Sequence, residues 1–186
     1  MPDPIELDQI DTLGAGAVGE PGQRAFYIQA RAESLQLTVL VEKEQIALLA
    51  TEAVAFLDRI ADEYPEEPVT LPEAVAELRE PTVPLFRARL IGLGFDPERE
   101  LVLIELRERS EDADEADDHG DDNEEEKEEQ EQEEEGEGWI ARIYATRPQV
   151  RAMAARGAAS VAAGRPRCPL CDGPMDPSGH RCPRWN

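Results

Sequence analysis

The stretch LQLTVLVEKEQIALLATEAVAFLDRIA, residues 35–61, contains a change of hydrophobic period that decides the fold class. In its first seven residues, apolar and polar side chains alternate at the start and β-branched residues become frequent toward the end, which is typical of a strand. The next apolar residues recur at spacings of three and four, which predicts an amphipathic helix over about residues 43–63 that Pro65 ends. The expected apolar face of this helix comprises Ile46, Leu49, Ala50, Ala53, Val54, Leu57, Ile60 and Ala61.

Two more strands are expected before this stretch, at residues 12–18 and 25–30, with the turn sequence Gly-Glu-Pro-Gly at residues 19–22 between them. Gly14, Gly16 and Gly19 match the spacing G-x-G-x-x-G. A dinucleotide-binding loop would need a helix after these glycines, whereas here a turn and another strand follow. We therefore interpret the motif as a glycine-rich strand and turn.

The second half of the chain repeats the same order. Strands are expected at residues 85–95, 101–106 and 139–145, and Thr146 and Gln149 have the spacing of a capping box that begins a helix. This helix should end near Gly164, with an apolar face of Val150, Met153, Ala154, Ala158, Val161 and Ala162. Between the halves, residues 65–83 read as a proline-rich linker with one short helical turn near residues 74–78.

Each half therefore reads strand, strand, strand, helix. We predict an α+β fold with antiparallel sheets and two helices, built as two βββα units unless the repeat is a coincidence. The expected organisation is an α+β domain over residues 1–164, interrupted by an acidic insert at residues 111–137, and a zinc-knuckle module over residues 165–186.

The charge is concentrated in that insert. The chain has a net charge of −23, and residues 111–137 hold 18 acidic side chains and one lysine, whereas residues 138–186 hold eight arginines and two aspartates. Such an insert cannot bury enough apolar surface to order itself, so we expect a disordered loop. It could serve only solubility, cover the basic C-terminal quarter, or dock a basic partner. The net negative charge of the whole chain excludes a uniformly basic nucleic-acid binder, but it does not exclude a local basic surface.

The C-terminal sequence carries the strongest chemical signal, a C-x2-C-x8-H-x-C motif formed by Cys168, Cys171, His180 and Cys182. Thiolate and imidazole are the donors that Zn²⁺ prefers, and a complete Cys3His set is typical of a structural site. A redox pair would need a helix after Cys171, but Asp172-Gly173-Pro174 follows. The motif therefore predicts a structural zinc ion rather than a catalytic one or free thiols.

Residues at both ends of the chain resemble a family of uncharacterised actinobacterial proteins with a domain of unknown function. The matching segments are residues 19–26, 29–30, 41–45, 163–171 and 176–186. Relatives tend to have glycine where this chain has Asp172. The resemblance implies that the gene belongs to a recurring trio, beside a histidine-phosphatase-like and a kinase-like protein, which suggests an accessory role.

The leading functional hypothesis is a non-catalytic, zinc-stabilised adaptor that contacts protein partners. It rests on the filled metal motif, on the lack of a second histidine outside the acidic insert, and on the implied gene trio. One alternative is a nucleic-acid-binding regulator that uses Arg165, Arg167, Arg181 and Arg184. Another is an enzyme or sensor for a small anionic metabolite held by Arg24.

The sequence also predicts where the protein acts. No apolar run approaches the roughly 18 residues of a membrane-spanning helix, and residues 1–6 have no features of a secretory signal. The cysteines are confined to one motif, which argues against a disulfide scaffold. We therefore expect a cytoplasmic protein without membrane contact.

Overall fold

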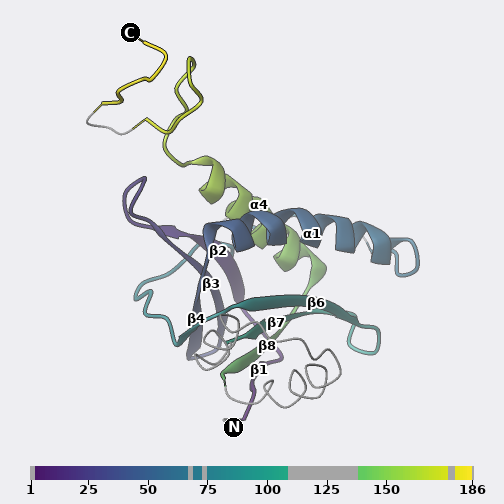
Figure 1. Ribbon diagram of the computed structural model, residues 1–186. Helices are drawn as coiled ribbons and strands as arrows, with labels where there is room; N and C mark the ends of the chain where they lie inside the picture. The colour runs from purple at the N-terminus through teal and green to yellow at the C-terminus, as the bar shows by residue number, and fades with distance from the viewer. Residues whose placement is uncertain (1–2, 67–68, 73–74, 109–137, 176–178, 186) are drawn as a thin grey trace, which may run out of the picture.

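The computed structural model describes residues 3–66, 69–72, 75–108, 138–175 and 179–185, and the predicted insert of residues 111–137 lies outside them. The described residues form two four-stranded sheets and two long helices (Figure 1). The first sheet contains β2 (Thr12–Val18), β3 (Ala25–Ala32), β4 (Leu35–Val41) and β5 (Phe86–Arg87) in that order. The second has the order β1 (Ile5–Leu7), β8 (Ile140–Ala145), β7 (Leu101–Arg107) and β6 (Leu90–Asp96).

The topology repeats. Strands β2, β3 and β4 form an antiparallel meander that runs into α1 (Lys43–Ala61), and β6, β7 and β8 form another that runs into α4 (Arg147–Ala162). Each sheet also receives one short strand in parallel, because β5 pairs with β4 and β1 pairs with β8. The α+β class with two βββα units is therefore confirmed, and each unit is extended by a strand from outside its own meander.

The single strand predicted over residues 85–95 is wrong. Leu85 and Ala88 donate backbone hydrogen bonds to β4, at Thr38 and Leu40. The next residue, Arg89, already donates to Arg107 in the other sheet, at 2.8 Å. The chain therefore changes sheets within this segment, and β5 and β6 are separate strands. The sequence did not predict β1 at all.

One core joins both sheets and both helices. It includes Ile28 and Val39 from the first sheet, Ile143 from the second, Leu57 from α1 and Met153 from α4. Helices α1 and α4 cross each other over the sheets (Figure 1). The described residues contain no helix that is both long enough and apolar enough to cross a membrane.

The predicted helix faces need two corrections. Val54 of α1 is exposed, and so are Ala158 and Ala162 of α4. Gly157 is buried instead, and a Cβ atom added there would lie 3.1 Å from Cγ2 of Ile46 on α1. The absence of a side chain at Gly157 thus lets the two helices approach closely. Glycine is not part of the apolar pattern, so hydrophobic periodicity alone does not reveal this position.

The predicted linker packs on the first sheet. The helical turn expected near residues 74–78 begins outside the described residues, which lack residues 73–74; beside this gap, the Val75 N–H donates to Pro72 O at 3.0 Å. A Cβ atom at Gly14 of β2 would lie 2.8 Å from Ala76 O, so glycine allows this close approach. Gly14 and Gly16 belong to β2, in agreement with a glycine-rich strand.

Buried Gln29 of β3 fixes the end of this linker. Its amide nitrogen donates to Arg79 O at 2.9 Å, and its amide oxygen accepts a hydrogen bond from Arg79 N at 2.8 Å. Gln29 is only 3% exposed, so these bonds satisfy a polar side chain that the fold removes from water.

Candidate metal centre

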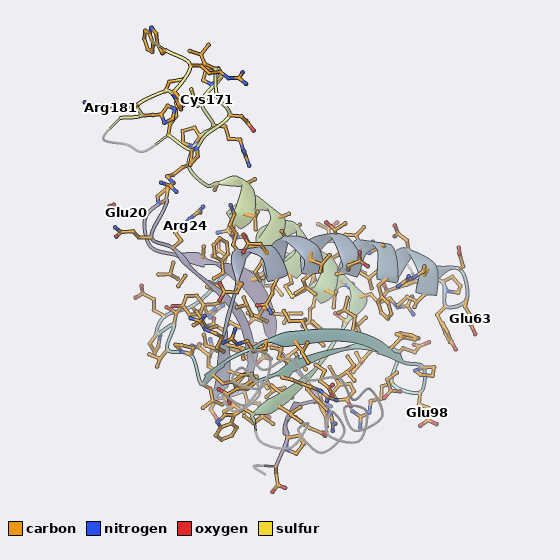
Figure 2. The ribbon with its side chains drawn as sticks, viewed as in Figure 1. Glu20, Arg24, Glu63, Glu98, Cys171 and Arg181 are labelled. Carbon is orange, nitrogen blue, oxygen red and sulfur yellow. The ribbon has the colours of Figure 1, made fainter. Side chains whose placement is uncertain are left out.

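The Cys/His motif lies in a segment that projects beyond the C-terminal end of α4, where Figure 2 labels Cys171 and Arg181. None of its described residues belongs to the shared hydrophobic core. Cys168 is the one buried residue among those described after residue 164. The segment therefore has no apolar core of its own to hold its conformation.

The structure brings all four predicted ligands together. One donor atom from each of Cys168, Cys171, His180 and Cys182 lies within 4.8 Å of the others. The Sγ atoms of Cys168 and Cys182 are 3.8 Å apart, and Cys171 Sγ lies 3.1 Å from His180 Nε2. A tetrahedral zinc site with Zn–S bonds of about 2.3 Å has sulfur atoms about 3.8 Å apart. The cluster therefore has the dimensions of a four-coordinate metal site.

A tight turn places the first two ligands. The Cys168 N–H donates to Gly173 O at 2.8 Å, and the Asp172 N–H donates to Cys168 O at 2.8 Å. Asp172 closes this turn with a left-handed backbone, φ 59°. Arg167 and Pro174 form an isolated β-bridge just outside it. The predicted turn residues between the ligands thus form a small hairpin that points Cys168 and Cys171 to the same side.

The hydrogen bonds of this turn also affect the thiols. Backbone N–H groups of Leu170 and Cys171 donate to Cys168 and lower its pKa to about 6. Burial raises the pKa of Cys182. Because a metal binds thiolate rather than thiol, Cys168 is prepared for coordination at neutral pH, whereas Cys182 must lose a proton on metal binding.

The donor set indicates what the cluster can do. Three sulfur atoms and one imidazole nitrogen suit a borderline or soft metal ion, and together they can fill all four positions of a tetrahedron. A metal held by four protein ligands has no open position for a substrate or an activated water. The cluster can therefore hold a metal ion that stabilises the segment.

For three of the four arginines predicted around the motif, the structure gives the neighbouring residues. Arg167 pairs with Asp172 at 3.0 Å, and Arg184 donates to Leu170 O at 3.0 Å. Arg165 instead lies beside Gly22, in the turn between β2 and β3. A Cβ atom added at Gly22 would lie 3.4 Å from Arg165 Cδ. Leu170 was not predicted from the sequence as a functional residue, but it is half exposed between the first two ligands. Its position between the two cysteines of the C-x2-C motif was the available signal.

The profile of a family described as "Protein of unknown function (DUF3090)" matches residues 5–182. The chain belongs to the DUF3090 family. The match covers both βββα units and all four donors of the Cys/His cluster, so in this DUF3090 protein the candidate metal centre lies within the family domain. No curated protein and no solved structure matches the chain.

Proposed function

We propose that this DUF3090 protein is a non-catalytic adaptor, whose C-terminal segment binds a structural zinc ion and presents a docking surface to another protein. The convergence of four protein donors within 4.8 Å carries this proposal, since it leaves the metal no position for a substrate. Zinc fits this donor set best, because closed Cys3His sites are typical of zinc that stabilises small modules.

The exposed side chains of the segment support a docking role. Trp185 is 81% exposed and Leu170 is 50% exposed, although each is a large apolar residue. Arg184 connects the two, since it precedes Trp185 in the chain and donates to Leu170 O. Tryptophan and arginine dominate the energetic centres of protein interfaces. A metal that rigidifies this small surface would lower the entropic cost of binding.

We expect the partner to be a protein in the cytoplasm. The phosphatase-like and kinase-like proteins suggested by the family resemblance are the first to test. A nucleic-acid partner is the competing class, but Arg167 and Arg184 already have contacts within the segment and Arg165 turns toward Gly22. These contacts reduce the basic surface that a phosphate backbone would need.

The proposal is tested by purifying the tagged full chain from its native host and identifying co-purifying proteins by mass spectrometry. Two variants separate the metal from the surface: Cys168→Ser/Cys171→Ser removes ligands, and Leu170→Ser/Trp185→Ser removes exposed apolar side chains. We expect a specific protein to be lost in both variants, with zinc retained only in the second. Direct binding of that purified protein to the wild type completes the test.

The adaptor function would be refuted if no protein bound the purified wild type, or if both variants bound as well as the wild type. Binding of single-stranded or duplex oligonucleotides that weakens steeply with salt, and that is lost in Arg181→Ala, would favour the nucleic-acid regulator instead.

A further inference from the structure

A second possible site lies at the base of the projecting segment. A cavity of about 390 Å³ opens between the start of β3, the β4–α1 junction, β5 and the end of α4. Phe26 and Val41 line it and are both buried core residues, so the cavity reaches the body of the fold. Its volume falls within the range of small-molecule pockets, roughly 300–1,000 Å³.

The charge of this cavity is opposite to that of the protein. Arg24, Lys43, Arg87 and Arg165 line it, and Glu42 is the one acidic lining residue. The lining therefore carries a net charge of +3 within a chain of net charge −23. We call this cavity the basic pocket. Four cations from four separate segments are unlike a solvated charge run, because only the tertiary fold brings them together.

Arg24 is held in place by the fold. Its Nη1 donates to Ser160 O at 3.1 Å, one of the last carbonyls of α4 that have no partner within the helix. Its guanidinium group also lies over the ring of Phe26, 5.7 Å from the centroid. Figure 2 shows Arg24 between the β2–β3 turn and the C-terminal end of α4. The bond to Ser160 uses one of five N–H donors, so this structural role orients the group without exhausting its donors.

Two glycines lie beside the arginines of the basic pocket. Gly22 has φ 101°, and a Cβ atom there would lie 3.4 Å from the Arg165 side chain. A Cβ atom at Gly164 would lie 3.4 Å from Arg24 Nη2. Both guanidinium groups therefore lie close to backbone, at distances where an added methyl group would make ordinary van der Waals contact with them.

The remaining lining charges differ in how firmly they are held. Arg87 pairs with Glu42 at 2.7 Å, and both side chains are about half exposed. An exposed pair of this kind contributes little stability, so Arg87 can exchange Glu42 for another anion at small cost. Lys43 is the first residue of α1, where the helix dipole adds positive potential.

We propose that the basic pocket binds a small phosphorylated metabolite. Guanidinium groups match pairs of phosphate oxygens, a lysine adds a point charge, and the apolar lining accommodates the uncharged part of the ligand. This site is separate from the metal cluster, and its occupancy does not depend on the adaptor function.

The proposal is tested by titrating inorganic pyrophosphate into the full-length protein by isothermal calorimetry at constant ionic strength. The test variant is Lys43→Gln/Arg87→Gln, which leaves the Arg24–Ser160 bond intact. The control is Arg151→Gln on α4, whose exposed ion pair with Asp58 resembles the Arg87–Glu42 pair. Circular dichroism melting of all three proteins confirms that they are folded.

We expect saturable binding of one pyrophosphate per chain, weakened about tenfold or more in Lys43→Gln/Arg87→Gln and unchanged in Arg151→Gln. Three results would each overturn the proposal: no saturable binding to the wild type, equal losses in the test and control variants, or sulfate binding as strong as pyrophosphate binding. The last would indicate a general ion effect rather than a phosphate site.

Discussion

The backbone of Asp172 offers a quantitative test of the metal centre. Asp172 follows the second ligand in the turn and has φ 59°. An L-residue in this left-handed region costs roughly 1–2 kcal/mol relative to glycine. Since the surrounding segment has no hydrophobic core, we expect its folding to be coupled to metal binding, so that this backbone cost appears in the metal affinity.

The informative comparison is Asp172→Gly against Asp172→Ala. Both changes remove the carboxylate that pairs with Arg167 at 3.0 Å, so their difference reports only the backbone. A difference of about 1–2 kcal/mol corresponds to a metal dissociation constant about 5- to 30-fold lower for Asp172→Gly than for Asp172→Ala.

The assay is competition for zinc between each variant and a chromophoric chelator at pH 7.5. The matched control is the same pair of changes at Asp62, the residue after α1, which has a right-handed backbone with φ −66°. The Asp62 variants should not differ in metal affinity. If Asp172→Gly and Asp172→Ala bound zinc within twofold of each other, the turn would not be coupled to the metal and the reasoning would be refuted.

Three further predictions concern the α+β domain. Gln29→Ala should lower the free energy of unfolding by about 2–4 kcal/mol in urea titrations, because the N–H and C=O of Arg79 lose their buried partner; a loss below about 0.5 kcal/mol would contradict this. Gly157→Val should destabilise by about 1–3 kcal/mol, since even a Cβ would lie 3.1 Å from Ile46; a melting temperature equal to that of wild type would show that the helices can separate freely. Burial raises the pKa of Glu105, but hydrogen bonds from two arginines outweigh it and lower that pKa. The carboxylate therefore stabilises the fold above its ordinary pKa of about 4.3, and the advantage of wild type over Glu105→Gln should fade as the pH falls below that value; an advantage that did not decrease at all below that pH would exclude this role.

Local sequence patterns predicted most of the elements. The change of period after Val41 predicted β4 and α1, and the Thr146–Gln149 capping box predicted where α4 begins. In the structure, the Thr146 N–H donates to Gln149 Oε1 at 2.9 Å. These signals are local, so no knowledge of the rest of the fold was needed to read them.

Features that depend on distant partners were missed. Strand β1 has three residues and pairs with β8, more than 130 positions away in the sequence. Arg147 is another case: it is 4% exposed, donates to Tyr64 O and lies 5.2 Å from the ring centroid of Phe95. Arginine is rarely buried, and both partners lie more than 50 positions earlier in the sequence.

The two candidate sites likewise differ in how far apart their residues lie in the sequence. The metal donors lie within 15 residues, and their spacing alone predicted the cluster that the structure brings together. The basic pocket draws on four separate segments, so the sequence indicated Arg24 as an anion contact but gave no signal for Lys43 or Arg87. Only the fold places those charges beside one another.

The most direct test of the central claim is the metal content of the purified full-length chain, measured by inductively coupled plasma mass spectrometry beside Cys171→Ser. We predict one zinc ion per wild-type chain and its loss in the variant, with the α+β domain still folded by circular dichroism. A wild-type protein without stoichiometric metal, or a Cys171→Ser variant that retained a full equivalent, would contradict it.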